Sequence, residues 1–87
     1  MSDFTRRDVH CLKIFPQFFR EVRTGQKTFE IRETRERDFK TDDLVMLMEW
    51  DPVSEYFTQQ QLLKKIGFVT DWEQKPGYVV FSLLEVE

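Results

Sequence analysis

The order of the elements is decided by the stretch VHCLKIFPQFFREVRTGQKTFEIR, residues 9–32. In residues 9–14 the apolar side chains alternate with others, which is typical of a strand with one buried face. Pro16 suits the first turn of a helix, where its missing N–H costs nothing. Alternation returns in residues 27–33 and predicts a second strand. The stretch therefore predicts a strand, a short helix and another strand.

The helix is expected to begin at Pro16 and to end at Thr24. Gly25 follows, and glycine readily takes the left-handed conformation that ends helices. A helix of two to three turns depends on packing for its stability. Apolar residues recur at helical spacing, and we expect this stripe to lie in the core: Phe15, Phe18, Phe19 and Val22.

The second half of the chain predicts three more strands. Residues 44–50 are a near-continuous apolar run, typical of a strand buried on both faces. Residues 56–71 are interpreted as its strand partner, although residues 59–65 also have helical propensity, so that strand and helix both stay open there. Residues 77–86, rich in Val and Phe, predict the last strand. We therefore expect an α+β fold in which a small five-stranded sheet closes into a β-barrel, with the helix flanking a cleft.

Length and composition restrict the classes of function. The chain has 87 residues, enough for a single domain with a core at about 9–86 and a flexible tail at 1–7. One Cys and one His exclude an internal disulfide and fall short of the roughly four ligands of a structural zinc site. The three glycines are too far apart for a phosphate-binding loop. We expect no metal, no cofactor and no membrane segment, and a cytoplasmic monomer.

The charge is distributed unevenly along the chain. Residues 1–40 carry ten Lys or Arg and seven Asp or Glu, a net +3, whereas residues 41–87 carry three and nine, a net −6. The total of −3 argues against strong non-specific binding to DNA. Either the basic half forms a local site for an anionic ligand, or the charges interleave on the folded surface and solvate it.

The densest polar signal is GQKTFEIR, residues 25–32. In a strand, Thr28, Glu30 and Arg32 share one face, at intervals of about 7 Å. Facing a cleft, Arg32 can hold a phosphate or carboxylate with two parallel hydrogen bonds, and Glu30 can accept from a nucleobase or act as a general base. Lys27 can hold an anion or act as a nucleophile. Facing solvent, the same residues form an ordinary polar strand surface.

Two further residues are assigned by their place in the first strand. Lys13 faces either the same cleft as Glu30 or water. His10 shares its face with apolar neighbours, and such a histidine is more often a hydrogen-bonded core residue than a catalyst.

Several stretches together resemble the ASCH superfamily of PUA-like small barrels, and most closely its compact branch of unknown function from bacteria and phages. They are HCLKI at 10–14, GQKTFEIR at 25–32, DFKTDDL at 38–44, EWD at 49–51 and GYVVFSL at 77–83. The resemblance implies a PUA-like β-barrel with a cleft beside the helix, lined by the G-x-K-T-x-E-x-R motif, that binds RNA or modified nucleosides. Our candidate ligand-binding residues are accordingly Lys13, Lys27, Thr28, Glu30 and Arg32.

The chain departs from this family at two points. Asp42 stands where members usually carry Gly, so we expect a slightly strained turn. One branch removes the acetyl group from acetylcytidine with a Lys, Thr and Glu set. Lys27 matches the Lys, but Glu30 replaces the Thr, and the insertion that carries the third residue has no counterpart.

Three hypotheses follow. The first is a non-catalytic module that binds RNA or a nucleotide. The second is an amidohydrolase acting on a modified nucleoside, with Lys27 and Glu30 as candidate catalytic residues. The third is a protein-interaction module that uses an exposed edge strand.

Overall fold

The computed structural model describes residues 8–86, and the tail predicted at residues 1–7 lies outside this range. Five strands and one helix follow in the order β1 (Val9–Ile14), α1 (Pro16–Arg23), β2 (Phe29–Glu33), β3 (Leu44–Asp51), β4 (Tyr56–Thr70) and β5 (Tyr78–Leu84). The strands form a single sheet in the order β1-β3-β4-β5-β2. The β1–β3 pair is parallel and the other three pairs are antiparallel. The predicted five strands and single short helix are confirmed.

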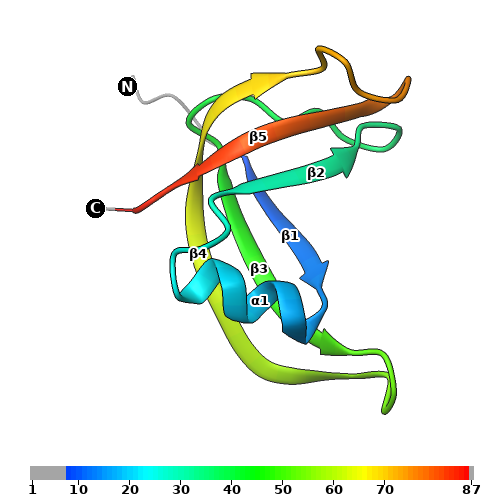
Figure 1. Ribbon diagram of the computed structural model, residues 1–87, viewed down its shortest axis with the longest axis vertical. Helices are drawn as coiled ribbons and strands as arrows, with labels where there is room; N and C mark the ends of the chain where they lie inside the picture. The colour runs from blue at the N-terminus through cyan, green and yellow to red at the C-terminus, as the bar shows by residue number, and fades with distance from the viewer. Residues whose placement is uncertain (1–7, 87) are drawn as a thin grey trace, which may run out of the picture.

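The sheet curls into a half-barrel that stays open between its two edge strands, β1 and β2 (Figure 1). Each edge strand pairs on one side only, β1 with β3 and β2 with β5. In the view of Figure 1, α1 lies in front of β3, below β2. A side-chain bond links the two edges, because Nη2 of Arg32 in β2 donates to the carbonyl oxygen of Lys13 in β1 at 3.1 Å. The sheet thus curls as expected but does not close through strand pairing.

The helix begins at Pro16, as predicted, and ends at Arg23, one residue before the predicted end at Thr24. Thr24 is the C-cap, and both its N–H and its hydroxyl donate to the carbonyl oxygen of Arg20, at 3.0 and 3.1 Å. Gly25 then has a φ of 86°, which is the left-handed conformation expected of it. This turn directs the chain from α1 toward β2.

Strand β3 is fully covered on one face. Val45 and Leu47 are buried, whereas Met46 and Met48, which point to the other face, are only half-buried. The prediction that this strand is buried on both faces is wrong, because the helix and the curled sheet cover only its inner side. The core consists of Leu12, Ile14, Phe19, Val22, Phe39, Val45, Leu47, Ile66, Phe81 and Leu83.

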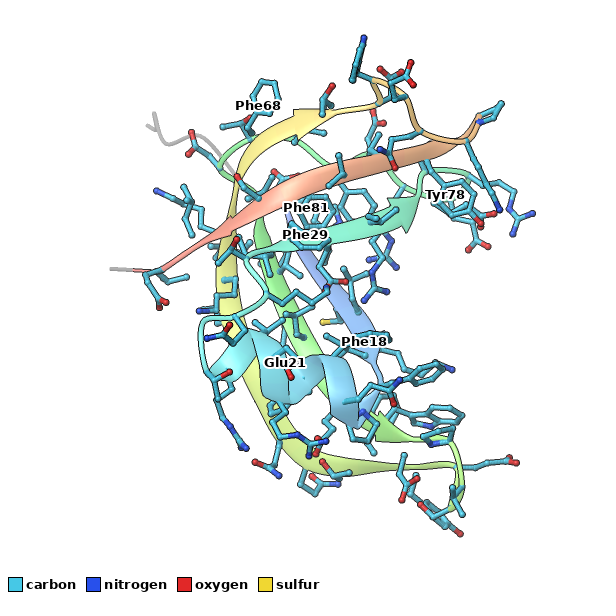
Figure 2. All side chains as sticks on the ribbon, viewed as in Figure 1. Phe18, Glu21, Phe29, Phe68, Tyr78 and Phe81 are labelled. Carbon is cyan, nitrogen blue, oxygen red and sulfur yellow. The ribbon has the colours of Figure 1, made fainter. Side chains whose placement is uncertain are left out.

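The apolar stripe of the helix is divided between the core and the surface. Phe19 and Val22 are buried, but Phe15 and Phe18 are exposed. The expectation that all four residues lie in the core is therefore wrong for two of them. Figure 2 shows Phe18 between α1 and β2, on the open side of the half-barrel. A short helix on a curved sheet buries only the side that touches the sheet.

Strand β4 is continuous from Tyr56 to Thr70, so residues 59–65 are strand. They pair with β3, with Leu62 opposite Leu47. Cross-strand packing here outweighs the helical propensity of the segment. The pairing is interrupted by a register shift between Met48 and Trp50, and Gln59 on β4 has a positive φ of 78°.

His10 is a buried, hydrogen-bonded core residue, as predicted. Its Nε2 lies 2.8 Å from Oδ2 of Asp43, and its ring lies 4.7 Å from the ring of Phe39. The backbone N–H of Lys40 donates to the same Asp43 oxygen at 3.1 Å. The buried pair joins β1 to the turn before β3.

Asp42 has a φ of 79°, so the strained turn predicted at this position is confirmed. Its N–H donates to the carbonyl oxygen of Ile66 at 2.8 Å, which holds the turn in place. We expect Asp42→Gly to raise the free energy of unfolding by roughly 0.5–1 kcal/mol, because glycine takes this conformation without a Cβ clash. Urea denaturation measures the change. Asp42→Ala keeps the Cβ and should give no gain, and equal destabilisation by both variants would contradict the account.

Within residues 8–86, no helix combines the length and the apolar character needed to cross a bilayer.

Candidate functional site

Strand β2 places Glu30 and Arg32 on the inner face of the half-barrel. Lys27 N–H donates to the carbonyl oxygen of Glu21 at 2.9 Å, which ties the segment after the Gly25 turn to the last turn of α1. Pairing with β5 then sets Glu30 opposite Phe81 and Arg32 opposite Val79. Glu30 is therefore buried, with only 3% of its surface exposed.

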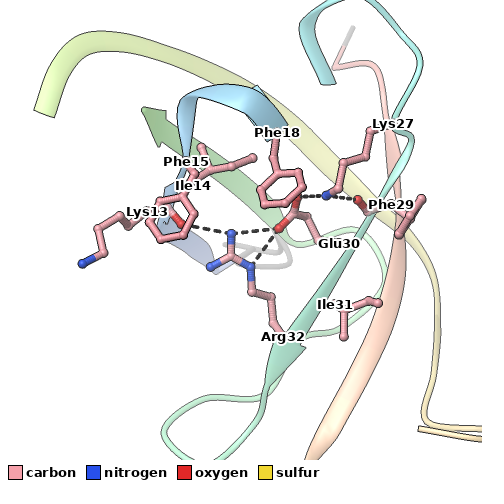
Figure 3. Close-up of a pocket in the computed structure, with 9 residues that line it drawn as sticks. All are labelled: Lys13, Ile14, Phe15, Phe18, Lys27, Phe29, Glu30, Ile31 and Arg32. Atoms are coloured by element: carbon pink, nitrogen blue, oxygen red, sulfur yellow. Dashed lines mark hydrogen bonds and ion pairs between the residues drawn. The ribbon is translucent and has the colours of Figure 1, made fainter. Parts of the chain in front are cut away.

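The Glu30 carboxylate lies at the centre of an ion cluster, defined here as Lys27, Glu30 and Arg32. Its Oε1 accepts from Nε of Arg32 at 2.8 Å and also lies 2.8 Å from Nη2 of Arg32 as an ion-pair contact, and its Oε2 accepts from Nζ of Lys27 (Figure 3). Lys27 Nζ also donates to the carbonyl oxygen of Phe29 at 2.7 Å. A buried carboxylate requires such partners, since an unpaired buried charge is strongly destabilising. The cluster thus fixes three charged groups in one geometry.

The ion cluster lies in a pocket of about 540 Å³. The same pocket is lined by Lys13 at the end of β1 and by apolar residues from β1, α1 and β2: Ile14, Phe15, Phe18, Phe29 and Ile31. A volume of this size falls within the range of small-molecule sites, about 300–1,000 Å³, which are usually apolar with a few placed polar groups. The pocket combines an apolar, aromatic wall with a charged floor.

Four of the five predicted ligand-binding residues share this pocket: Lys13, Lys27, Glu30 and Arg32. Thr28 does not belong to the lining. It is exposed and precedes β2, and its carbonyl oxygen accepts the N–H of Leu83. The predicted row of three polar side chains on one strand face is therefore wrong at its first member, because β2 begins only at Phe29.

The hydrogen bonds restrict what each charged group can do. Arg32 directs Nε and Nη2 at Glu30 and at the Lys13 carbonyl, so this pair of donors is not free for a ligand. Lys27 Nζ donates to two oxygen atoms, whereas a nucleophilic amine needs a free lone pair. The arrangement favours holding a ligand over attacking one.

The sequence alone did not identify the apolar wall. Phe15 and Phe18 belong to a helical stripe that was assigned to the core, and Phe29 and Ile31 lie on the strand face opposite to Glu30. One available signal was the number of Phe residues in and next to an eight-residue helix. The one narrow side that such a helix buries cannot cover all of them.

One group of possible metal ligands occurs among the described residues, namely Asp8, His10 and Asp43, whose ligand atoms lie within 4.8 Å of one another. His10 Nε2 already bonds to Asp43, and Asp43 also accepts the Lys40 N–H. These bonds account for the two buried members as a structural pair.

Comparison with known proteins identifies the family of the chain. A search of curated proteins finds no match for the chain. Residues 9–83 match the family described as Domain of unknown function (DUF3850), so the match covers all five strands almost to the end of β5. The chain belongs to the DUF3850 family.

Proposed function

We propose that the chain is an RNA- or nucleotide-binding module of the ASCH or PUA-like type, which holds its ligand in the pocket beside α1. The single observation that carries the proposal is the pocket itself, in which exposed Phe rings surround a fixed cluster of two cations and one carboxylate. Nucleotides combine a flat apolar base with a negative phosphate, and this pairing of surfaces suits both parts.

Aromatic side chains supply the first kind of contact. Phe15, Phe18 and Phe29 all line the pocket and are all exposed. The Lys27 ammonium lies 5.8 Å from the ring centroid of Phe18 and 5.0 Å from that of Phe29, so the two rings flank one cation. Stacking of a base on such a ring contributes about 1–3 kcal/mol to binding and does not depend on which base is stacked.

The half-barrel and the resemblance to the ASCH superfamily support the same proposal. The G-x-K-T-x-E-x-R motif supplies three of the pocket residues, Lys27, Glu30 and Arg32. The net charge of the chain is −3, so binding must depend on this local cationic site and not on a basic surface. We expect a single-stranded or flexible ligand, because only an unpaired base can enter a pocket.

The test compares two phenylalanines of nearly equal exposure. Phe18, 43% exposed, lines the pocket, whereas Phe57, 45% exposed, lies on β4 outside it. We expect Phe18→Ala to weaken binding of a fluorescent, mixed-sequence RNA octamer about tenfold in an anisotropy titration, through lost stacking. Phe57→Ala should leave the affinity unchanged.

Salt provides an internal control for the same titration. If phosphates contribute, the affinity must fall between about 50 mM and about 200 mM salt. Equal effects of Phe18→Ala and Phe57→Ala would refute the proposal, and so would failure of both the octamer and the nucleoside monophosphates to bind at low salt.

The alternative of an amidohydrolase has one supporting observation, since Lys27 and Glu30, its candidate catalytic residues, are in direct contact. Both groups are occupied by their mutual bond, by Arg32 and by the Phe29 carbonyl. We therefore expect a binding module and not an enzyme. Incubation with acetylcytidine decides between them: release of cytidine that disappears in Lys27→Ala would favour hydrolysis.

A further inference from the structure

The charged side chains of the pocket differ in how much of their hydrogen-bonding capacity is used. Glu30 accepts two hydrogen bonds and makes one further ion-pair contact with Arg32 Nη2, and a carboxylate has about four acceptor positions. Arg32 Nη1, in contrast, has no hydrogen-bond partner within residues 8–86. Lys13 Nζ likewise bonds to no acceptor in the described chain, and lies 4.0 Å from the centroid of the Trp50 ring. The side-chain capacity that remains is almost entirely donor capacity.

In the view of Figure 3 the unused donors extend to the same side. In Figure 3 the Arg32 nitrogen without a dashed line points away from Glu30, toward the side on which the Lys13 ammonium extends. Lys13 is exposed, so its ammonium can move to meet a ligand. The Lys13 backbone is already tied to the other donor nitrogen of Arg32, which keeps the two residues together.

The charges of the pocket do not balance. The pocket is lined by three cationic residues, Lys13, Lys27 and Arg32, and by one carboxylate, that of Glu30, which leaves two positive charges in excess. A phosphate monoester carries about −1.5 to −2 at neutral pH and offers only acceptors. A phosphate at this rim would match both the surplus charge and the unused donors.

We propose that Arg32 Nη1 and Lys13 Nζ form a phosphate subsite at the rim of the pocket, so that the ligand is a phosphate-bearing nucleotide unit and not a neutral nucleoside. The inference rests on the proposed function and adds the chemical class of the ligand. The base lies against the apolar wall of Phe15, Phe18 and Phe29, and the phosphate lies at the β1 side.

A neutral nucleoside fits the same groups poorly. Its base amino and imino groups need acceptors, and the one side-chain acceptor in the lining, Glu30, is buried and already contacted by three cationic nitrogens. Without a phosphate the ligand would leave the donors of Lys13 and Arg32 unused. The difference between nucleoside and nucleotide is therefore the sharpest test.

The experiment titrates the protein by calorimetry with the four common ribonucleosides, their 5′-monophosphates, inorganic phosphate and the RNA octamer. We expect each monophosphate that binds to bind about tenfold or more tightly than its nucleoside, since charge-assisted bonds to phosphate are among the strong ones. Lys13→Gln should weaken monophosphate binding about three- to tenfold and reduce its salt dependence. Lys75→Gln removes the same charge from an exposed loop residue outside the pocket and should change nothing.

The outcomes separate the two proposals. Nucleosides that bind as tightly as their monophosphates would overturn the phosphate subsite and leave the proposed function standing. Inorganic phosphate that binds as tightly as the nucleotides would show that the apolar wall contributes nothing, which would overturn a nucleotide as the ligand and with it the proposed function, while an anion site at the rim would remain. If the octamer alone binds, an unchanged affinity in Lys13→Gln overturns the subsite. Failure of the octamer and of every monophosphate to bind would refute both.

Discussion

Replacing Arg32 with leucine is expected to lower the free energy of unfolding by about 3 kcal/mol, because a buried carboxylate loses one of its two cations. Glu30 would keep only Lys27 as a charged partner. The bond from Arg32 to the Lys13 carbonyl, which spans the open side of the half-barrel, would also be lost. Arg32 is itself half-buried, so the estimate lies at the low end of values for buried pairs.

The matched control is another arginine paired with a glutamate two positions away. Arg35 donates to Glu33 at 3.1 Å, and both side chains are exposed. Arg35→Leu should therefore change stability by less than about 0.5 kcal/mol. Urea denaturation measures both variants. Similar small effects at the two positions would show that the ion cluster does not hold the open edges together.

The second large effect is expected at Phe81, which is 1% exposed and lies opposite Glu30 on the neighbouring strand. Its ring lies 4.9 Å from that of Phe39, which in turn packs on His10. Phe81→Ala should lower the free energy of unfolding by about 4 kcal/mol, through lost contacts and a cavity beneath the site. Since the whole domain is expected to be stable by only about 5–15 kcal/mol, this variant will be close to unfolding.

Two variants make the Phe81 result interpretable. Phe81→Leu keeps most of the volume and should cost about 1–2 kcal/mol, which remains measurable if the alanine variant does not fold. Phe68→Ala removes the same ring at a position that is 72% exposed, and should cost less than about 1 kcal/mol. Figure 2 shows Phe68 pointing away from the sheet, while Phe81 lies among other side chains. Equal losses at the two positions would contradict the assigned core.

Local pattern was sufficient to predict most elements. The alternation in β1, the proline at the start of α1 and the glycine after it each act within a few residues, and the structure has all three where they were expected. The segment at 59–65 was ambiguous because its helical propensity is overruled by pairing with β3, a contact between distant parts of the chain. The open edge between β1 and β2 depends on pairing partners, which periodicity does not specify.

The sequence predicted the charged residues of the candidate site but not its apolar wall. Lys27, Glu30 and Arg32 stand close together in the sequence, so strand β2 and the segment just before it bring them into one pocket. Phe15 and Phe18 recur at helical spacing, and this spacing does not distinguish a residue that faces the core from one that faces a cleft.

The His10–Asp43 pair joins residues 33 positions apart, and only the parallel pairing of β1 with β3 makes them neighbours.

The most direct test of the central claim follows the backbone amide shifts of the labelled protein while the RNA octamer, and then the 5′-monophosphates, are added. The account predicts that the largest movements occur in the pocket, at Lys27, Glu30 and Arg32, together with Lys13 and Phe18. Amides at the tip of the β3–β4 hairpin, around Val53, should stay in place. Absence of movement at Lys27, Glu30 and Arg32 with every one of these ligands would contradict the account.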